Sequence, residues 1–207
     1  MYNEQLAMVD WRRRTSQLYA RARAEVDPAA GHALWRAGRD EIFRHHPQSP
    51  LLPDDQIRTT GIEYWPYDPG VRFELPLTPV RGEHLFDLST SSKGTVTLRL
   101  LGRVQLPAPL DFQLDVWRLH QYGGGLFVPL CDGTAGTSTY IGGRHLLDTV
   151  KGADLGGSDA TITIDLNFAY HPSSQYNPNW ISPLAPPGNT TDVPVHAGER
   201  LTAKPSD

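Results

Sequence analysis

Apolar residues in the first quarter of the chain recur with the 3.6-residue period of an α-helix. The segment 3–26 carries one such apolar stripe and is predicted to be helical. Asp27 and Pro28 then supply an N-cap and a proline at the first helical position, which opens a second helix. Pro47 ends this helix, because the residue before a proline avoids helical backbone angles. We expect the two helices to pack as a hairpin over residues 1–47.

After the proline-rich stretch 48–53 the apolar period becomes two, which is typical of half-buried strands. Alternation of this kind predicts strands at 71–77, 96–100, 112–116 and 161–168. Three glycines at 123–125 precede a further apolar run at 126–130 and have a length suited to a hairpin. One face of the last strand carries polar residues and needs water or a ligand; they are Thr161, Thr163, Asp165 and Asn167.

Strands this frequent, without helices between them, favour a mostly antiparallel sheet. We therefore expect an α+β fold that is mainly β, with the two N-terminal helices packed on an antiparallel β-sandwich or barrel. The chain is expected to form a single domain over residues 1–207. Its parts are the helical hairpin at 1–47, a β-rich body at 56–200 and a loose polar tail at 201–207.

Composition indicates a globular protein and removes several classes of partner. The 19 glycines and 18 prolines among 207 residues favour many short strands and turns over a helix bundle. A net charge of −4 provides no positive field for a polyanion, so no nucleic-acid partner is expected. Because there is no signal-peptide pattern and no long apolar run, we expect a cytoplasmic, soluble protein without a membrane partner. The single cysteine, Cys131, excludes an internal disulfide and fits a reducing compartment.

Established catalytic and cofactor motifs are absent from the sequence. It has no GxxxxGK[ST] phosphate loop, no GxGxxG turn, no HExxH helix, no GxSxG elbow and no EF-hand loop. No two of the eight histidines have the i, i+2 or i, i+4 spacing that places two metal ligands on one face. We therefore predict neither a cofactor nor a metal site.

The remaining candidate chemistry lies in a dense polar run between residues 132 and 177. Residues 132–140 form a Gly- and Thr-rich loop whose backbone amides can cradle an oxyanion or simply make a tight turn. Residues 165–172 favour a strand that continues into a rigid irregular loop.

Several segments in this half carry a family resemblance: DGTAGTSTYIGGRHLLDTVKGADLGG at 132–157, TIDLNFAYHPSSQYNPNWISPLAPPGN at 163–189 and HAGER at 196–200. They resemble the bacterial family catalogued as domain of unknown function 1684. The front, with WRRR at 11–14 and YWPYDPGVRF at 64–73, is similar to its actinobacterial-type members, so the resemblance covers roughly residues 10–200. The resemblance implies no known activity, ligand or catalytic residue.

The resemblance locates the family's signature without assigning roles to its residues. The central motif matches Asp132, Thr134, Thr139, Tyr140, Gly142, Gly143 and Arg144. The C-terminal motif matches Asp165, Asn167, Tyr170, Pro172, Tyr176, Pro183 and Asn189. The chain departs from the common family residues at His145, His171, Ser174, Ser182 and Gly188. Members commonly have cysteine in place of Ser174 and Ser182, so any thiol or metal chemistry there is lost in this protein.

Our first functional hypothesis is a small-molecule binding domain. The polar face of 161–167 and the loop that carries Arg144 would line a cavity, with three tyrosines as its walls. The planar guanidinium of Arg144 would hold an anionic ligand by a carboxylate or phosphate. The predicted ligand-binding residues are Asp132, Thr134, Thr139, Tyr140, Arg144, Asp165, Asn167, Tyr170 and Tyr176.

A hydrolase-type enzyme is the first alternative, and the sequence leaves open whether the protein is an enzyme. Asp132 or Asp165 would act as the base, and Arg144 with loop amides would stabilise an oxyanion. His145 and His171 would titrate near neutrality and support such chemistry.

A purely structural or protein-interaction domain is the second alternative. Arg144 would then bridge Asp132 and Asp165 as a buried ion pair, and Asn167 and Asn189 would satisfy backbone groups of the loops. An open cavity at Arg144 favours a ligand, whereas full burial with paired donors favours this structural role. The sequence does not set the oligomeric state.

Overall fold

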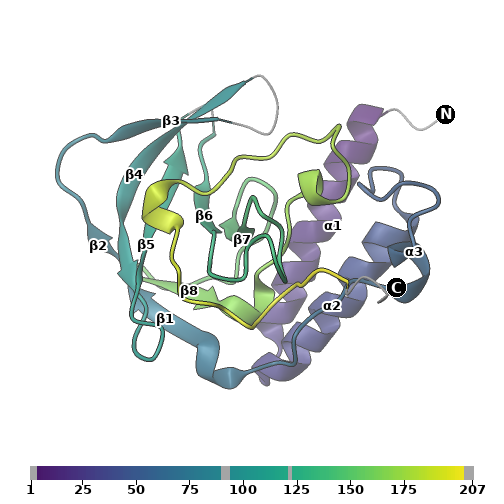
Figure 1. Ribbon diagram of the computed structural model, residues 1–207, viewed down its shortest axis with the longest axis horizontal. Helices are drawn as coiled ribbons and strands as arrows, with labels where there is room; N and C mark the ends of the chain where they lie inside the picture. The colour runs from purple at the N-terminus through teal and green to yellow at the C-terminus, as the bar shows by residue number, and fades with distance from the viewer. Residues whose placement is uncertain (1–3, 90–93, 121–122, 203–207) are drawn as a thin grey trace.

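The computed structural model describes residues 4–89, 94–120 and 123–202. Figure 1 shows the long helices gathered on one side of the molecule and the strands of the large sheet on the other. Beyond Thr202, the tail predicted for 201–207 lies outside the described residues. Within the described part of the chain, no helix combines the length and the apolar character that crossing a bilayer requires.

Two packed helices form the front of the molecule, as predicted. Helix α1 spans Glu4–Ala24 and helix α2 spans Pro28–His45. The carboxylate of Asp27 accepts a 3.0 Å hydrogen bond from the backbone N–H of Ala29, which makes Asp27 the N-cap of α2. A short helix, α3 at Ile57–Thr60, lies in the connection between this hairpin and the sheets.

The described residues contain two antiparallel sheets. The larger has the order β2-β4-β5-β6-β7, with β3 also paired to β4, and the smaller pairs β1 with β8. The strands are β1 Arg72–Pro76, β2 Thr78–Pro79, β3 Leu85–Ser89, β4 Thr95–Gln105, β5 Gln113–Leu119, β6 Leu126–Leu130, β7 Arg144–Asp148 and β8 Thr161–Asp165. Because the β1–β8 pair does not join the described ladder of the larger sheet, the body is sandwich-like rather than a closed barrel.

Strand β4 contributes to hydrophobic clusters on both faces of the larger sheet. Leu100 packs with Trp117 on the face that points away from β8, whereas Val104 packs in the cluster that contains Ile164 of β8. A bulge between Leu100 and Gly102 shifts the register and switches the buried face. A Cβ at position 102 would lie 2.5 Å from the carbonyl oxygen of Thr78, so this close approach requires glycine.

A second, mainly aromatic core joins the helices to the sheets. Trp35 of α2 and Phe168 are both buried, and their ring centroids lie 4.8 Å apart. His32 stacks on Trp35 and forms a 2.9 Å hydrogen bond with the backbone oxygen of Asn167. Tyr64 packs in the same cluster, so the chain that enters β1 is anchored to α2 before the sheets begin.

Several strand assignments differ from the sequence-based prediction, which included neither β2 at Thr78–Pro79 nor β3 at Leu85–Ser89. The strand predicted for 161–168 ends at Asp165, whose carboxylate accepts a hydrogen bond from the N–H of Asn167 and caps the 3₁₀ helix Leu166–Phe168. Strand β7 was not predicted. All five of its residues are buried, so its sequence shows no alternation of polar and apolar positions.

Candidate functional site

The guanidinium of Arg144 is fully buried and is used by the protein itself. Its Nη2 donates a 2.7 Å bond to Oδ2 of Asp132 and a 3.0 Å bond to the carbonyl of Val195. Its Nη1 donates to the carbonyls of Ala197 and Glu199. Arg144 therefore fixes the segment 195–199 onto strand β7 and presents no exposed surface to a ligand.

Asp132 is saturated with hydrogen bonds on both carboxylate oxygens. Oδ1 accepts from the N–H of Thr134 at 2.9 Å, its hydroxyl at 2.6 Å and the N–H of Val195 at 3.1 Å. The hydroxyls of Thr134 and Thr139 lie 2.9 Å apart. Burial acts to raise the pKa of Asp132, but Arg144 and the bonds from Thr134 outweigh it and hold the pKa below its ordinary value.

This geometry matches half of the structural alternative for Arg144. The arginine pairs with Asp132, but the predicted bridge to Asp165 is wrong, because Asp165 lies beside Arg72 instead. The predicted binding of loop backbone groups is confirmed for Asn167, whereas Asn189 binds backbone carbonyls of strands β5 and β6 instead. Asn167 donates to the carbonyl of Asp68, and Asn189 donates to the carbonyls of Asp115 and Pro129.

The predicted tyrosine residues lie around a buried carboxylate that the sequence analysis missed. Glu199 is fully buried, and Oε2 accepts a 3.0 Å bond from the hydroxyl of Tyr176 and a 2.6 Å bond from the N–H of His171. Oε1 accepts from Arg39 and from the hydroxyl of Tyr64. Burial acts to raise the pKa of Glu199, whereas Arg39 and His171 lower it and prevail. The HAGER segment of the family resemblance was the available signal for this residue.

The remaining two tyrosines contact the same cluster from its sides. The ring of Tyr170 lies 4.9 Å from the guanidinium carbon of Arg39, and the N–H of Tyr140 donates to Nε2 of His171 at 3.2 Å. Because Nε2 of His171 accepts a hydrogen bond, the ring is neutral. Tyr140, Tyr170 and Tyr176 therefore do not line one cavity around Arg144. Tyr170 and Tyr176 border two separate cavities, each of which is also lined by His171.

The expectation that the two histidines titrate near neutrality is wrong. Burial lowers the pKa of His145 to about 3, and it lowers the pKa of His171 to about 4. Both rings stay neutral at physiological pH and pack against aromatic neighbours such as Phe127 and Tyr176.

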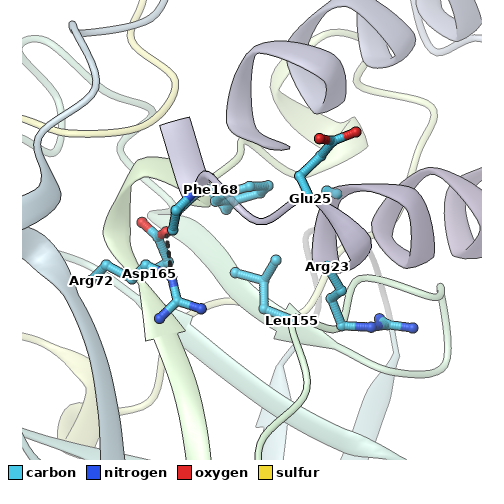
Figure 2. Close-up of a pocket in the computed structure, with 8 residues that line it drawn as sticks. Arg23, Glu25, Arg72, Leu155, Asp165 and Phe168 are labelled. Atoms are coloured by element: carbon cyan, nitrogen blue, oxygen red, sulfur yellow. Dashed lines mark ion pairs between the residues drawn. The ribbon is translucent and has the colours of Figure 1, made fainter. Parts of the chain in front are cut away.

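Asp165 differs from Asp132 because one of its carboxylate oxygens accepts no hydrogen bond. Oδ1 accepts bonds of 3.0 and 2.8 Å from the backbone and side-chain amides of Asn167. Oδ2 is buried and accepts no hydrogen bond from any residue that the structure describes, with Nε of Arg72 at 3.7 Å. Burial raises the pKa of Asp165 to about 6. Figure 2 shows this carboxylate in a pocket of about 70 Å³ beside Arg72 and Phe168.

A larger cleft, of about 530 Å³, lies between the two sheets. Both sheets supply its apolar walls, which are formed by Leu77, Leu101, Val116, Leu126, Leu147 and Ile162. Its polar rim includes Thr149 and the segment 157–161. Of the polar face predicted for 161–167, only Thr161 lines this cleft among the described residues, and sequence alternation gave no signal for a cleft at the end of the sandwich. In the described part of the chain, no three His, Cys, Asp or Glu side chains gather in a way that could hold a metal ion.

A pair of N-terminal helices on an antiparallel, sandwich-like body with buried ionic clusters defines the class of this protein. Residues 58–200 match the family described as "Protein of unknown function (DUF1684)", and the chain belongs to this family. It is similar to an uncharacterized protein of Haloarcula marismortui whose solution NMR structure is known, with 32% identity and a TM-score of 0.58. That similarity covers 80% of this chain and 90% of the other. The chain matches none of the curated proteins.

Proposed function

We propose that the protein binds a small, predominantly apolar molecule in the cleft between the two sheets. The observation that carries this proposal is the cleft itself. Its volume of about 530 Å³ falls in the range of ~300–1,000 Å³ that is typical of small-molecule sites. Apolar side chains from both sheets meet a polar rim, and this combination is the usual composition of such sites.

The charge of the cleft indicates that its ligand is uncharged or weakly cationic. Asp154 and Asp159 line it, whereas no arginine or lysine among the described residues does. The anionic ligand expected from Arg144 therefore has no counterpart in this cleft. A neutral aromatic or aliphatic body would remove apolar surface of Leu126 and Leu101 from water at about 25 cal/mol per Å².

The hydrolase alternative receives less support from the geometry. Both oxygens of Asp132 are hydrogen bonded, its pKa is lowered, and Arg144 has no exposed surface for an oxyanion. Neither buried histidine accepts a proton near pH 7. Asp165, the other expected base, has a pKa raised to about 6, but it contacts neither Arg144 nor the 132–140 loop that would form the oxyanion site.

A fluorescence titration with the neutral apolar probe N-phenyl-1-naphthylamine tests this proposal. Leu126 is half-buried in the cleft wall, and Leu126→Gln replaces apolar surface there with an amide. Leu85→Gln is the matched control, because Leu85 is 51% exposed on β3 and is not part of the cleft. We expect saturable probe binding to the parent and to Leu85→Gln, and affinity at least tenfold weaker for a folded Leu126→Gln. Absence of saturable binding, or equal affinity for the two variants, would contradict the proposal.

A further inference from the structure

We propose that the pocket around Asp165 is a separate binding site for the ammonium group of a small primary amine. This inference does not rest on the apolar cleft, because the two cavities have different walls. Asp165, Arg72 and Phe168 border the smaller pocket, whereas Leu126 and Leu147 border the cleft. The occupants also differ in chemistry, one being charged and the other apolar.

The Asp165 carboxylate is a preorganised hydrogen-bond acceptor. Its side chain is 1% exposed. Asp165 is the last residue of β8 and is paired with Arg72 in the ladder between β8 and β1. Asn167 donates twice to Oδ1, and it also binds both the N–H and the carbonyl of Asp68. These bonds fix the carboxylate plane, and Oδ2 is buried and accepts no hydrogen bond from the described residues. Its charge partner is Arg72, whose Nε lies 3.7 Å away in the ion pair that Figure 2 draws.

The free atom is an acceptor, so the group that binds it must be a donor. A buried carboxylate oxygen without a hydrogen-bond donor is costly. A neutral hydroxyl would satisfy this hydrogen bond but would leave the charge paired only over 3.7 Å with the partly exposed Arg72. Nε of Arg72 stands 3.7 Å away, beyond hydrogen-bond distance, and the Arg72 side chain is 32% exposed. An ammonium group supplies both the donor and the charge, and the exposed Arg72 is able to turn towards solvent.

The dimensions of the pocket favour a small amine. Its volume of about 70 Å³ accommodates a short alkylammonium group rather than a large ring system. Ala22, Leu155 and Phe168 provide apolar walls for the carbon chain. Figure 2 shows the charged ends of Arg23 and Glu25 on the opposite side of the pocket from Asp165, so neither group occupies the acceptor.

The titration of Asp165 gives the site a characteristic pH dependence. The charged or titratable groups that surround it are Arg72 of β1, Tyr67 and Asp68 before β1, and Arg23 and Glu25 at the end of α1. Alkylammonium ions stay charged from pH 5 to pH 8, whereas Asp165, with a pKa of about 6, loses its charge as the pH falls through this range. We therefore expect amine affinity to fall roughly tenfold between pH 8 and pH 5.

The test is a titration of the full chain with ethylammonium chloride, followed by amide chemical shifts at pH 8 and pH 5. Ethanol is the neutral isostere, and Leu126→Gln is the control for the cleft. We expect ethylammonium to shift the amides around Asp165 in the parent and in Leu126→Gln, with the pH dependence above. We expect Asp165→Asn to weaken this binding at least tenfold, because Nδ2 replaces the free acceptor. Equal effects of ethanol and ethylammonium, or no saturable shift at pH 8, would overturn the proposal.

A second variant keeps the test decisive if Asp165→Asn does not fold. Arg72→Gln removes the neighbouring cation while leaving the free oxygen of Asp165 in place. We expect it to bind ethylammonium several-fold more tightly than the parent at pH 8, because the charge repulsion is gone. Unchanged or weaker affinity in this variant would show that the ammonium group does not bind beside Arg72, and the proposal would be wrong.

Discussion

The buried charged groups of this protein differ in how completely the protein itself supplies their hydrogen bonds. Arg144, Asp132 and Glu199 are almost entirely inaccessible and are bound by carbonyls, amides or hydroxyls of the protein. Asp165 is equally buried, but one of its oxygens accepts no hydrogen bond from the described residues. Asp132 and Glu199 have hydrogen bonds on both carboxylate oxygens, and Arg144 uses both of its Nη atoms while its buried Nε has no partner among the described residues. These groups hold segments of the chain together, whereas the carboxylate of Asp165 retains one oxygen with capacity for a donor.

Arg144→Ala is expected to destabilise the fold rather than to remove a ligand contact. The substitution leaves the Asp132 carboxylate and the carbonyls of 195–199 without their donor. Breaking a buried pair from one side typically costs about 3–5 kcal/mol. Urea unfolding measures the loss, and probe binding by the fraction that remains folded serves as the control. A variant of parental stability would show that the pair contributes little.

Asp165→Asn is expected to stabilise the folded protein at neutral pH. Because burial raises the folded-state pKa of Asp165 from 3.8 to about 6, the folded state holds its proton more tightly than the unfolded state does. The penalty for the ionised carboxylate is therefore absent only well below the unfolded-state pKa of 3.8, grows as the pH rises, and is complete above the folded-state pKa. At pH 7.5 the variant should be more stable than the parent by up to roughly 3 kcal/mol.

The pH dependence of this stability difference is the measurement that matters. Urea unfolding of parent and variant at pH 7.5 and pH 4 should give a difference that falls to less than about 1 kcal/mol at the lower pH. An advantage of equal size at both values would show that the asparagine acts through packing or hydrogen bonds and not through removal of the buried charge.

Residue roles were harder to predict than residue positions. The sequence placed Asp132, Arg144 and Asp165 in important segments, yet it did not distinguish a saturated ion pair from a free carboxylate. Glu199 was not predicted as the centre of a buried cluster, because its partners Arg39, Tyr64 and Tyr176 come from distant parts of the chain. Such clusters have no local spacing pattern, and only the folded chain brings them together.

Helices and strands were predictable from the sequence where one side of the element is buried and the other is exposed to solvent. Both helices and strand β1 have one buried and one exposed side, so their apolar period was visible in the sequence. Strand β7 is buried on both sides and gave no alternation. The 3₁₀ turn after β8 was missed because Asp165 bonds its own neighbouring amide, which overrides the apparent strand pattern of 166–168.

At the scale of the whole molecule, two cores meet along the segment 166–170 and should unfold together. The cluster between the sheets contains Leu166 and Ala169, and the cluster beneath the helices contains Phe168 and Tyr170 from the same short segment. Arg39 of α2 also binds the buried carboxylate of Glu199. The helices therefore cannot separate from the body without exposing an unpaired charge.

We predict one cooperative unfolding transition, as expected for the single domain inferred from the sequence. Far-UV circular dichroism monitors the helices, and near-UV circular dichroism monitors aromatic packing. Their urea midpoints should coincide in the parent. An earlier transition in the far-UV signal would show that the helical hairpin unfolds independently and that residues 1–47 form a separate unit.

Arg39 and Arg144 bind residues 195–199, so the pairing of these two cations depends on the order in which the chain is synthesised. Arg39 and Arg144 leave the ribosome well before Glu199, Ala197 and Val195, which supply their partners. Until those residues emerge, the nascent chain has two cations that cannot be buried without a large desolvation penalty. A chain that stops before residue 195 lacks these partners, and we expect it to leave Arg39 and Arg144 unpaired and its interior open to proteases.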